Sequence, residues 1–235
     1  SSYELHVLPS SGEPLLARST TLSNGEGADP IRTTIELQPG IVIRGRLIDK
    51  QTGEQVQPLQ IQYWPLPSNP NRSMNRTEGV SRRFIRKTNS FEMTVPPGGG
   101  LIAGGVENSA GRYVPAQLRK EDKGKGLGSR RDKERGMIPL EAFQAYKIVD
   151  VPTDAKDFAV ELELPRGLTR RGRIVDPEGK PIQGVVCSGL NPGWGRAQIL
   201  DGDQFEAKGL DPNIPRPLLF GHEGRNLTGK IELQG

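Results

Sequence analysis

The segment 41–48, IVIRGRLI, alternates between two kinds of side chain. One set of alternate positions is aliphatic or glycine: Ile41, Ile43, Gly45 and Leu47. The other set is mixed: Val42, Arg44, Arg46 and Ile48. Successive side chains of a β-strand point to opposite faces of the sheet. The pattern therefore predicts a strand with one buried face and with Arg44 and Arg46 on the other face.

Three more runs show the same alternation, at 58–64, 90–95 and 145–151. Their inward positions in the first two runs are Leu59, Ile61 and Tyr63, and Phe91, Met93 and Val95. Clusters of Gly, Pro, Asn and Asp separate the runs and favour turns. A short helix is expected only at 140–145. Short strands with regular turn signals predict an all-β sandwich.

The chain repeats part of this pattern. RGRLIDKQTG from Arg44 matches RGRIVDPEG from Arg171, at an offset of 127 residues. The residues before each copy match as well, TIELQPG from Thr34 and ELELPRG from Glu161, and KIELQG from Lys230 is a third echo. NSFEMTVPPG from Asn89 aligns with DQFEAKGLDP. A repeat of this length predicts tandem domains rather than a solenoid of short repeats.

The spacing of the copies predicts three parts. Residues 1–38 are expected to be the closing strands of a truncated preceding unit. Residues 39–165 form a complete sandwich unit with a long basic insertion near 119–136, and 166–235 form a shorter unit. In both copies the Asp and the Gly of the turn have a local role, because Asp caps backbone amides and Gly accepts a positive φ.

The frame GRIVDPEGKPIQGVV, with FE after an acidic turn and VPPG beyond, resembles the carboxypeptidase regulatory-like domain. The resemblance is best over 172–186 and 45–61. It implies a transthyretin-like (prealbumin-like) or immunoglobulin-like β-sandwich, related to the Cna-B type surface modules of bacteria. The zinc chemistry of that family belongs to a separate peptidase domain. The resemblance therefore implies a non-catalytic module, often in tandem and often outside the cytoplasm.

Composition narrows the possible chemistry. The 235 residues include 30 Gly and 20 Pro, a single cysteine, Cys187, and two distant histidines, His6 and His222. A disulfide framework and a Cys-based zinc site are excluded. No cofactor, metal site or catalytic residue is predicted, and no apolar run approaches the ~18 residues of a membrane span. Cys187 aligns with Ile61 and is expected in the core.

The net charge of +4 comes from one segment. Residues 119–136 hold eight basic and four acidic residues, and the rest of the chain balances at 24 against 24. The first interpretation is a solvated loop of mixed charge. The alternative is a polyanion-binding loop that uses Arg119, Lys120, Arg130, Arg131 and Arg135. Nucleic acid is not expected as a partner, because no aromatic residues are interleaved with the charges.

Aromatic residues lie just after the second strand in each copy: Tyr63 and Trp64 in the first copy, and Trp194 in the second. Aromatic side chains beside Asn and Arg can stack on sugars or peptides. They are the candidate ligand-binding residues of an alternative function, a carbohydrate-binding module. The competing interpretation is packing at the edge of the sandwich.

Other motifs are explained by turns. PPGGGLIAGG, from Pro96, is expected as a turn between strands and not as a dinucleotide site. His222 is expected at a turn or on the surface, and Asp201–Asp203 as an acidic turn. The sequence thus predicts a non-enzymatic structural or interaction module of a larger bacterial envelope or secreted protein. A protein or glycan partner at the cell envelope and an extracellular, periplasmic or cell-surface location are expected from the resemblance.

Overall fold

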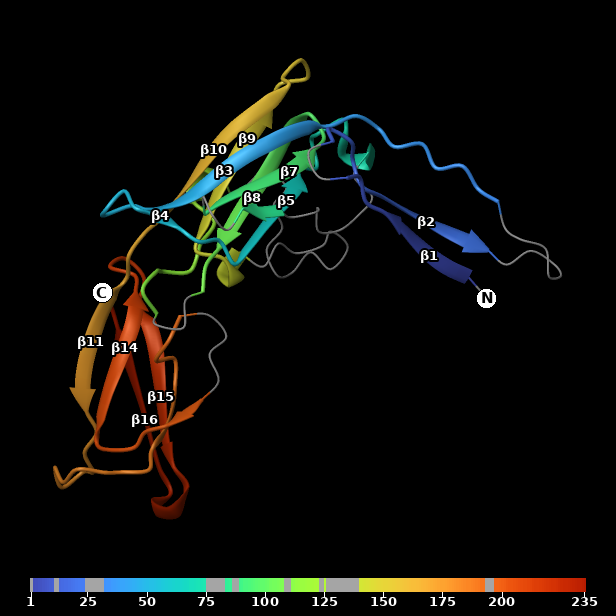
Figure 1. Ribbon diagram of the computed structural model, residues 1–235. Coiled ribbons are helices and arrows are strands. Elements are labelled where there is room, and N and C mark those ends of the chain that lie inside the picture. The colour runs from blue at the N-terminus through green and yellow to red at the C-terminus, as the bar shows by residue number, and fades with distance from the viewer. Residues whose placement is uncertain are drawn as a thin grey trace.

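The described part of the chain is all-β, with short 3-10 helices and no α-helix. The computed structural model describes residues 2–10, 13–23, 32–74, 83–85, 89–107, 111–122, 125, 140–192 and 197–235. Two layered bodies stand one above the other in Figure 1, and a two-stranded arm projects from the upper body. The all-β prediction is confirmed.

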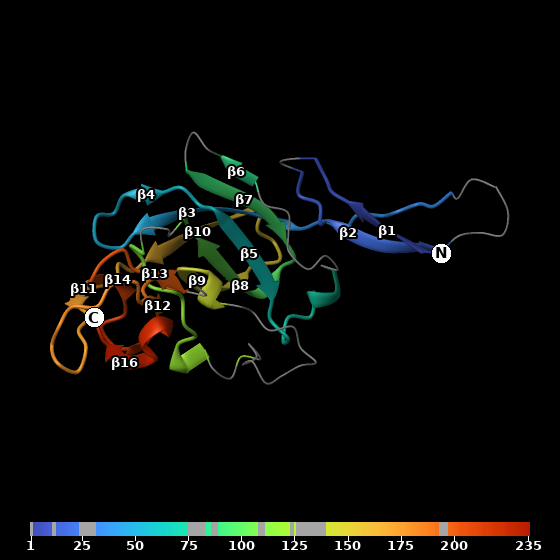
Figure 2. The ribbon, with the colours of Figure 1, turned by 90° about the horizontal axis from the view of Figure 1, so that it is seen from below.

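The arm is an antiparallel pair of β1 (Ser2–Val7) and β2 (Arg18–Ser23). Figures 1 and 2 show it extending sideways from the first body. Residues 32–38, which contain the IELQ match, follow without forming a strand. The Leu16 amide donates to the Gln38 carbonyl at 2.8 Å and ties this segment to the base of the arm.

The first body, here called the first sandwich (residues 41–164), contains two sheets. One has the order β10-β3-β7-β6, with β4 paired to β3, and the other has the order β5-β8-β9. β10 lies parallel to β3, and the other pairs are antiparallel. The strands are β3 (Ile41–Asp49), β4 (Gln55–Val56), β5 (Gln60–Pro65), β6 (Arg83–Ile85), β7 (Ser90–Val95), β8 (Gly98–Gly105), β9 (Ala145–Val151) and β10 (Asp157–Leu164). The 3-10 helices are η1 (Arg72–Met74), η2 (Lys120–Asp122) and η3 (Leu140–Ala142).

One core lies between these sheets and follows the predicted alternation. Its members come from both layers: Ile41, Ile43, Leu47, Phe91, Met93, Val95, Val160, Leu162 and Leu164, and Ile61, Tyr63, Ile102, Ala145, Val149 and Val151. A second cluster on the outer face of the β5-β8-β9 sheet is formed by Leu101, Ala103, Ala116, Leu140 and Phe143. The chain between β8 and β9 therefore covers that face.

The second body, the second sandwich (residues 168–233), is smaller. It pairs β11 (Leu168–Arg173) with β14 (Gln204–Leu210) in one sheet. The other sheet has the order β13-β12-β15-β16, with the strands β13 (Gln198–Ile199), β12 (Val186–Ser188), β15 (Arg216–His222) and β16 (Leu227–Leu233). The 3-10 helix η4 (Glu223–Arg225) joins the last two strands. Its core contains Cys187, Leu190, Phe205, Ala207, Leu210 and Leu218.

The turn after each RGR strand has the predicted local chemistry. Oδ1 of Asp49 accepts from the amide of Gln51 at 3.0 Å, and Gly53 has a φ of +72°. Oδ1 of Asp176 accepts from the amide of Lys180 at 2.8 Å, and Gly179 has a φ of +80°. Both glycines occupy the left-handed region that other residues rarely adopt.

Three expectations are corrected. Gly98–Gly105 is the central strand β8 and not a turn, because only Pro96 and Pro97 break the direction of the chain before it. Leu59, expected on the inward face, is 59% exposed, because β5 begins only at the next residue, Gln60. The helix expected at 140–145 is only the single turn η3, followed at once by β9.

Candidate interaction site

The outer face of the β10-β3-β7 sheet carries a ladder of ion pairs. Arg44 lies 3.0 Å from Glu92 of β7 and 3.0 Å from Asp157 of β10. Arg46 is bound by Glu161 of β10, so the two arginines of the first RGR motif join β3 to both of its neighbours. At the end of the strand, Lys50 lies 3.2 Å from Glu163.

The second RGR motif has fewer partners. Arg171 lies 3.1 Å from Glu206 of β14, and Arg173 lies 2.9 Å from Asp203 in the acidic turn just before β14. The side chain of Arg171 is 81% exposed, against 54% for Arg44. Solvent screening keeps each exposed pair weak, on the order of 0–1 kcal/mol. These arginines therefore fix strand register more than they add stability.

The aromatic candidates do not form one binding face. Tyr63 is 1% exposed in the core, where burial raises the pKa of its hydroxyl, so it has no surface to offer a ligand. Trp64 lies on the other side of the sheet and meets the Phe143 ring edge-on at a centroid distance of 5.7 Å. Trp194 lies outside the described residues. A role of Trp64 and Trp194 in sugar binding stays a prediction, and the observed packing of Trp64 agrees with the edge-packing interpretation.

The start of the basic segment is built around a buried carboxylate. Asp122 accepts hydrogen bonds from Arg119 Nε at 2.9 Å, Lys125 Nζ at 2.8 Å and the Tyr146 hydroxyl at 2.9 Å. Burial alone would raise the pKa of Asp122, but these donors outweigh it and hold that pKa below its usual value. Arg119 also packs over the Tyr146 ring at 5.4 Å. Two of the basic side chains thus serve the fold of the loop.

The remaining members of the polyanion candidate divide in two. Lys120 is exposed in η2, next to Arg119. Arg130, Arg131 and Arg135 lie outside the described residues. The structure therefore brings together only Arg119 and Lys120 of this set, and polyanion binding stays a prediction.

Cys187 and His222 have structural surroundings. Cys187 is fully buried in the core of the second sandwich, as expected, and burial raises the pKa of its thiol to about 11. His222 caps η4, where its Nδ1 accepts from the amide of Arg225 at 3.2 Å. Within the described ranges, no group of three or more His, Cys, Asp or Glu side chains is arranged to hold a metal ion.

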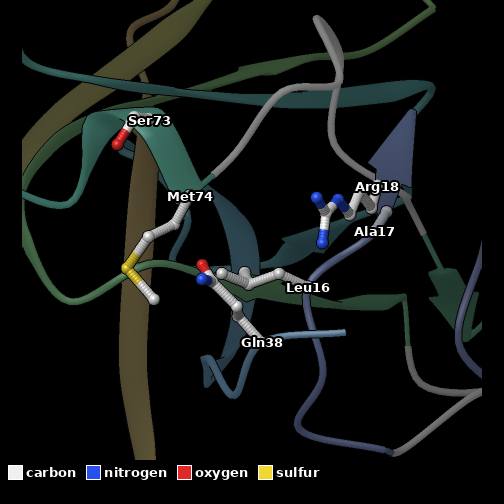
Figure 3. A pocket seen from close by; sticks show the side chains of 6 residues that line it. All are labelled: Leu16, Ala17, Arg18, Gln38, Ser73 and Met74. Carbon is white, nitrogen blue, oxygen red and sulfur yellow. The ribbon is translucent and has the colours of Figure 1, made fainter. Parts of the chain in front are cut away.

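A small pocket of about 190 Å³ lies where the arm meets the first sandwich. Figure 3 shows Ser73 and Met74 of η1 on one side, with Leu16, Gln38 and Arg18 across from them. Arg18 is already engaged, since its Nη1 donates to the Glu36 carbonyl at 2.8 Å. The pocket therefore presents a thioether, a hydroxyl and an amide, but no charged group without a partner.

The second sandwich offers the more apolar surface. An open groove of about 370 Å³ runs beside the end of β11 and is bordered by Ile174, Phe205, Phe220 and Ile231, among others. Outside the core, Val186, Ile199 and Leu219 share the outer face of the four-stranded sheet, because Val186 pairs with Ile199 and Ser188 pairs with Leu219. Ile199 is 73% exposed. We call Val186, Ile199 and Leu219 the outer apolar patch.

Sequence reasoning missed both the groove and the patch. A usable signal was present for the patch, since GVVCS and PLLF place apolar residues at consecutive positions, so that both faces of the strand are apolar. Among the described residues, no helix has the length and apolarity to cross a bilayer. No family model, curated protein or solved structure matches this chain.

Proposed function

We propose that this chain is a non-enzymatic structural or interaction module of a larger bacterial envelope or secreted protein. In this proposal the two sandwiches are tandem units of the carboxypeptidase regulatory-like type. The observation that carries it is that the RGR glycine, the first RGR arginine and the FE glutamate make equivalent contacts in the two copies.

The glycine of each RGR motif supports this reading. Gly45 is opposite Phe91, and Gly172 is opposite Phe205. In both cases the phenyl ring covers the glycine so closely that an added Cβ would lie 2.3 Å or 2.4 Å from the ring. A repeated motif whose glycine accommodates a core aromatic specifies a fold rather than a reaction.

The first arginine and the FE glutamate support it in the same way. Arg44 is opposite Glu92 and Arg171 is opposite Glu206, so each RGR…FE pair is a cross-strand ion pair on the outer face. Cross-strand pairs of opposite charge favour one register of the two strands. The glycine, the first arginine and the FE glutamate are therefore accounted for by strand pairing.

An interaction role is supported by the outer apolar patch. Soluble proteins routinely expose single apolar side chains, but contiguous exposed apolar side chains mark interaction sites. Here Val186 and Ile199 are direct cross-strand neighbours, and Leu219 lies on the adjoining strand. The patch is the surface on which we expect the module to contact an envelope component.

The location is tested by fractionating the source bacterium with an antibody raised against this chain. We expect the parent protein in the envelope or in the medium, and digestible by protease added to intact cells or to cells with a permeabilised outer layer. Recovery in the cytosol, protected from protease under both conditions, contradicts the proposal.

The interaction role is tested with purified chain and isolated envelope fragments. The double variant Ile199→Ser, Leu219→Ser should sediment with the fragments about tenfold less than the wild type, because a combined loss of about 1.4 kcal/mol from two residues at the centre of the patch lowers affinity tenfold. Leu59→Ser is the matched control, since Leu59 is an exposed leucine on the first sandwich. Equal loss in both variants contradicts a specific role of the patch.

A further inference from the structure

The exposed edge of β11 differs from the same edge of β3. In the first sandwich, β3 lies between β7 on one side and β10 on the other. Among the described residues of the second sandwich, β11 pairs with β14 alone. A strand with an unpaired edge presents a row of backbone donors and acceptors to which another strand can add.

The pairing of the two sandwiches identifies which neighbour is missing beside β11. Gly45 and Gly172 face the equivalent phenylalanines on β7 and β14. β11 therefore corresponds to β3, and β14 to β7. The side of β11 that is open is the side on which β3 carries β10.

Burial shows the consequence for side chains. Ile41 and Ile43, at the start of β3, are buried. The position that corresponds to Ile41 by the repeat is Leu168, which is 44% exposed. The apolar groove bordered by Ile174 and Phe220 continues from this edge toward the turn. The open edge thus joins backbone groups to uncovered apolar surface.

The charges on this edge show what would fit. On β3, Arg44 has two carboxylate partners, one of them Asp157 of β10, and Arg46 is bound by Glu161 of β10. On β11, the corresponding Arg171 contacts Glu206 of β14, and Arg173 contacts Asp203. The carboxylates that β10 contributes have no counterpart along the open edge within the described chain.

We propose that β11 takes up an added β-strand from a polypeptide in which aliphatic and acidic residues alternate, parallel to β11. The aliphatic side chains lie over the groove and the acidic ones reach Arg171 and Arg173. This surface is separate from the outer apolar patch, so the inference goes beyond the function proposed above. β10, with the sequence DFAVELEL, is the pattern of such a strand.

One residue sets the size of the side chain that fits. Leu162 of β10 packs over Gly104, whose added Cβ would lie 2.8 Å from the Leu162 Cδ1. Gly104 pairs with Ile61, and Phe220 pairs with Cys187, so Phe220 stands where Gly104 stands in the first sandwich. The groove beside β11 is therefore shallower than the slot for Leu162, and a valine should fit there better than a leucine.

The experiment uses the full chain, labelled with ¹⁵N, and the capped peptide DFAVELEL as probe. We expect amide shifts along 168–176 and at Phe220 that saturate with added peptide. The peptide DFAVEVEL, in which valine replaces the leucine that corresponds to Leu162, should bind at least as tightly as DFAVELEL. A peptide of the same composition with its apolar residues grouped together is the control. No saturable shift, or equal shifts with the control peptide, overturns the proposal.

Orientation and charge are tested separately. A nitroxide on the peptide's N-terminus should broaden the resonances of Leu168 and Thr169, because β10 starts beside Val42 in β3. Broadening at Asp176 instead overturns the parallel arrangement.

The variant Arg171→Glu, Arg173→Glu should bind the peptide about tenfold more weakly. Lys147→Glu, Lys230→Glu, with the same change in net charge on exposed lysines of β9 and β16, should bind it unchanged.

A milder pair of substitutions serves if the glutamate variant does not fold. If the glutamate variant does not fold, Arg171→Gln, Arg173→Gln replaces it and should bind several-fold more weakly than the wild type. Unchanged binding in a folded variant overturns the assigned role of the two arginines. Failure of all peptide binding, with the parent protein still found in the envelope, overturns this inference and leaves the proposed function standing.

Discussion

At the scale of single residues, the RGR motif is explained by what lies across from it. The sequence alternation correctly predicted that Arg44 and Arg46 point away from the buried face. It did not predict their partners, because Glu92, Asp157 and Glu161 lie 48 to 115 residues from the arginines that they contact, and their approach depends on strand register. Register is set by long-range pairing, which a local pattern does not contain.

The glycine of the motif gives the first prediction. An added Cβ at Gly45 would lie 2.3 Å from the Phe91 ring and 2.6 Å from the backbone oxygen of Val160 in β10. At Gly172 the three nearest atoms all belong to the Phe205 side chain, the closest at 2.4 Å, and a side chain shifts more readily than a backbone oxygen. Gly45→Ala should therefore cost about 2–3 kcal/mol of unfolding free energy and Gly172→Ala about 1 kcal/mol, as measured by urea denaturation.

Gly221→Ala is the control for these two changes. Gly221 lies in strand β15, and an added Cβ there meets nothing within 4 Å. Its unfolding free energy should stay within about 0.5 kcal/mol of the wild type. If Gly172→Ala proved as costly as Gly45→Ala, the difference attributed to β10 would be wrong.

At the scale of elements, the strands with regular alternation were predictable and the glycine-rich strand was not. β3, β7 and β9 follow from the sequence pattern, with inward Phe91, Met93 and Val95 as expected. Gly98–Gly105 was predicted as a turn because glycine is the usual turn residue. In the structure its glycines make room for large neighbours, since an added Cβ at Gly100 would lie 2.2 Å from the Tyr63 hydroxyl.

The candidate sites show the same limit. The expectation that Cys187 is buried was confirmed, because its alignment with Ile61 uses the alternation of a single strand. The groove beside β11 could not be predicted, because it depends on which strand is absent from an edge. Tyr63 was placed on the inward face by the pattern and is buried there, which is why it cannot serve as a ligand-binding residue.

Cys187 provides a prediction about β12 and the core that contains it. Burial raises the pKa of the thiol to about 11, so in the native state it is protonated and enclosed at pH 8. A disulfide reagent should label it at least about a hundredfold more slowly than in urea-unfolded chain, since labelling requires opening of the second sandwich. The thiol's rise in pKa also means that its contribution to stability is present below the unfolded value of ~8.5 and is lost as pH rises toward 11.

Core variants locate the opening that exposes the thiol. Leu218→Ala, in the same core as Cys187, should speed labelling more than tenfold, because large-to-small core changes cost about 2–5 kcal/mol. Met93→Ala, in the core of the first sandwich, should leave the labelling rate near the wild-type value. Equal acceleration by both variants would show that the two cores open as one unit.

At the scale of the whole molecule, a buried carboxylate of the first sandwich holds the connection to the second one. Asp49, at the end of β3, accepts from Arg166 Nε at 2.7 Å and from the Tyr113 hydroxyl at 3.0 Å. Arg166 lies in the short connection between β10 and β11, and its neighbour Gly167 donates to the Arg112 carbonyl at 2.9 Å. Asp49 therefore fastens the connection between the sandwiches to the first of them.

This arrangement predicts how the junction responds to acid. Burial by itself raises the pKa of Asp49, but hydrogen bonds from Arg166, Gln51, Tyr113 and Thr52 outweigh it and leave that pKa below its usual value. A lowered pKa in the folded state means that the stabilisation is present above the unfolded value of ~3.9 and is lost as pH falls through the folded value. Asp49→Asn should lose about 2–4 kcal/mol at pH 7. In urea denaturation from pH 7 to pH 3, its difference from the wild type should shrink below about pH 4.

The junction itself gives an independent readout of the same change. Without the Asp49 carboxylate, Arg166 is released, so trypsin at pH 7.5 should cut the Arg166–Gly167 bond several-fold faster in Asp49→Asn, as identified by mass spectrometry. Asp176→Asn is the matched control, because an asparagine oxygen can still accept from the Lys180 amide and Arg225 lies 3.4 Å away. It should change unfolding free energy by less than about 1 kcal/mol and leave cleavage after Arg166 unchanged. An Asp49→Asn chain with the wild-type pH profile and cleavage rate would show that the connection is held by its backbone contacts alone.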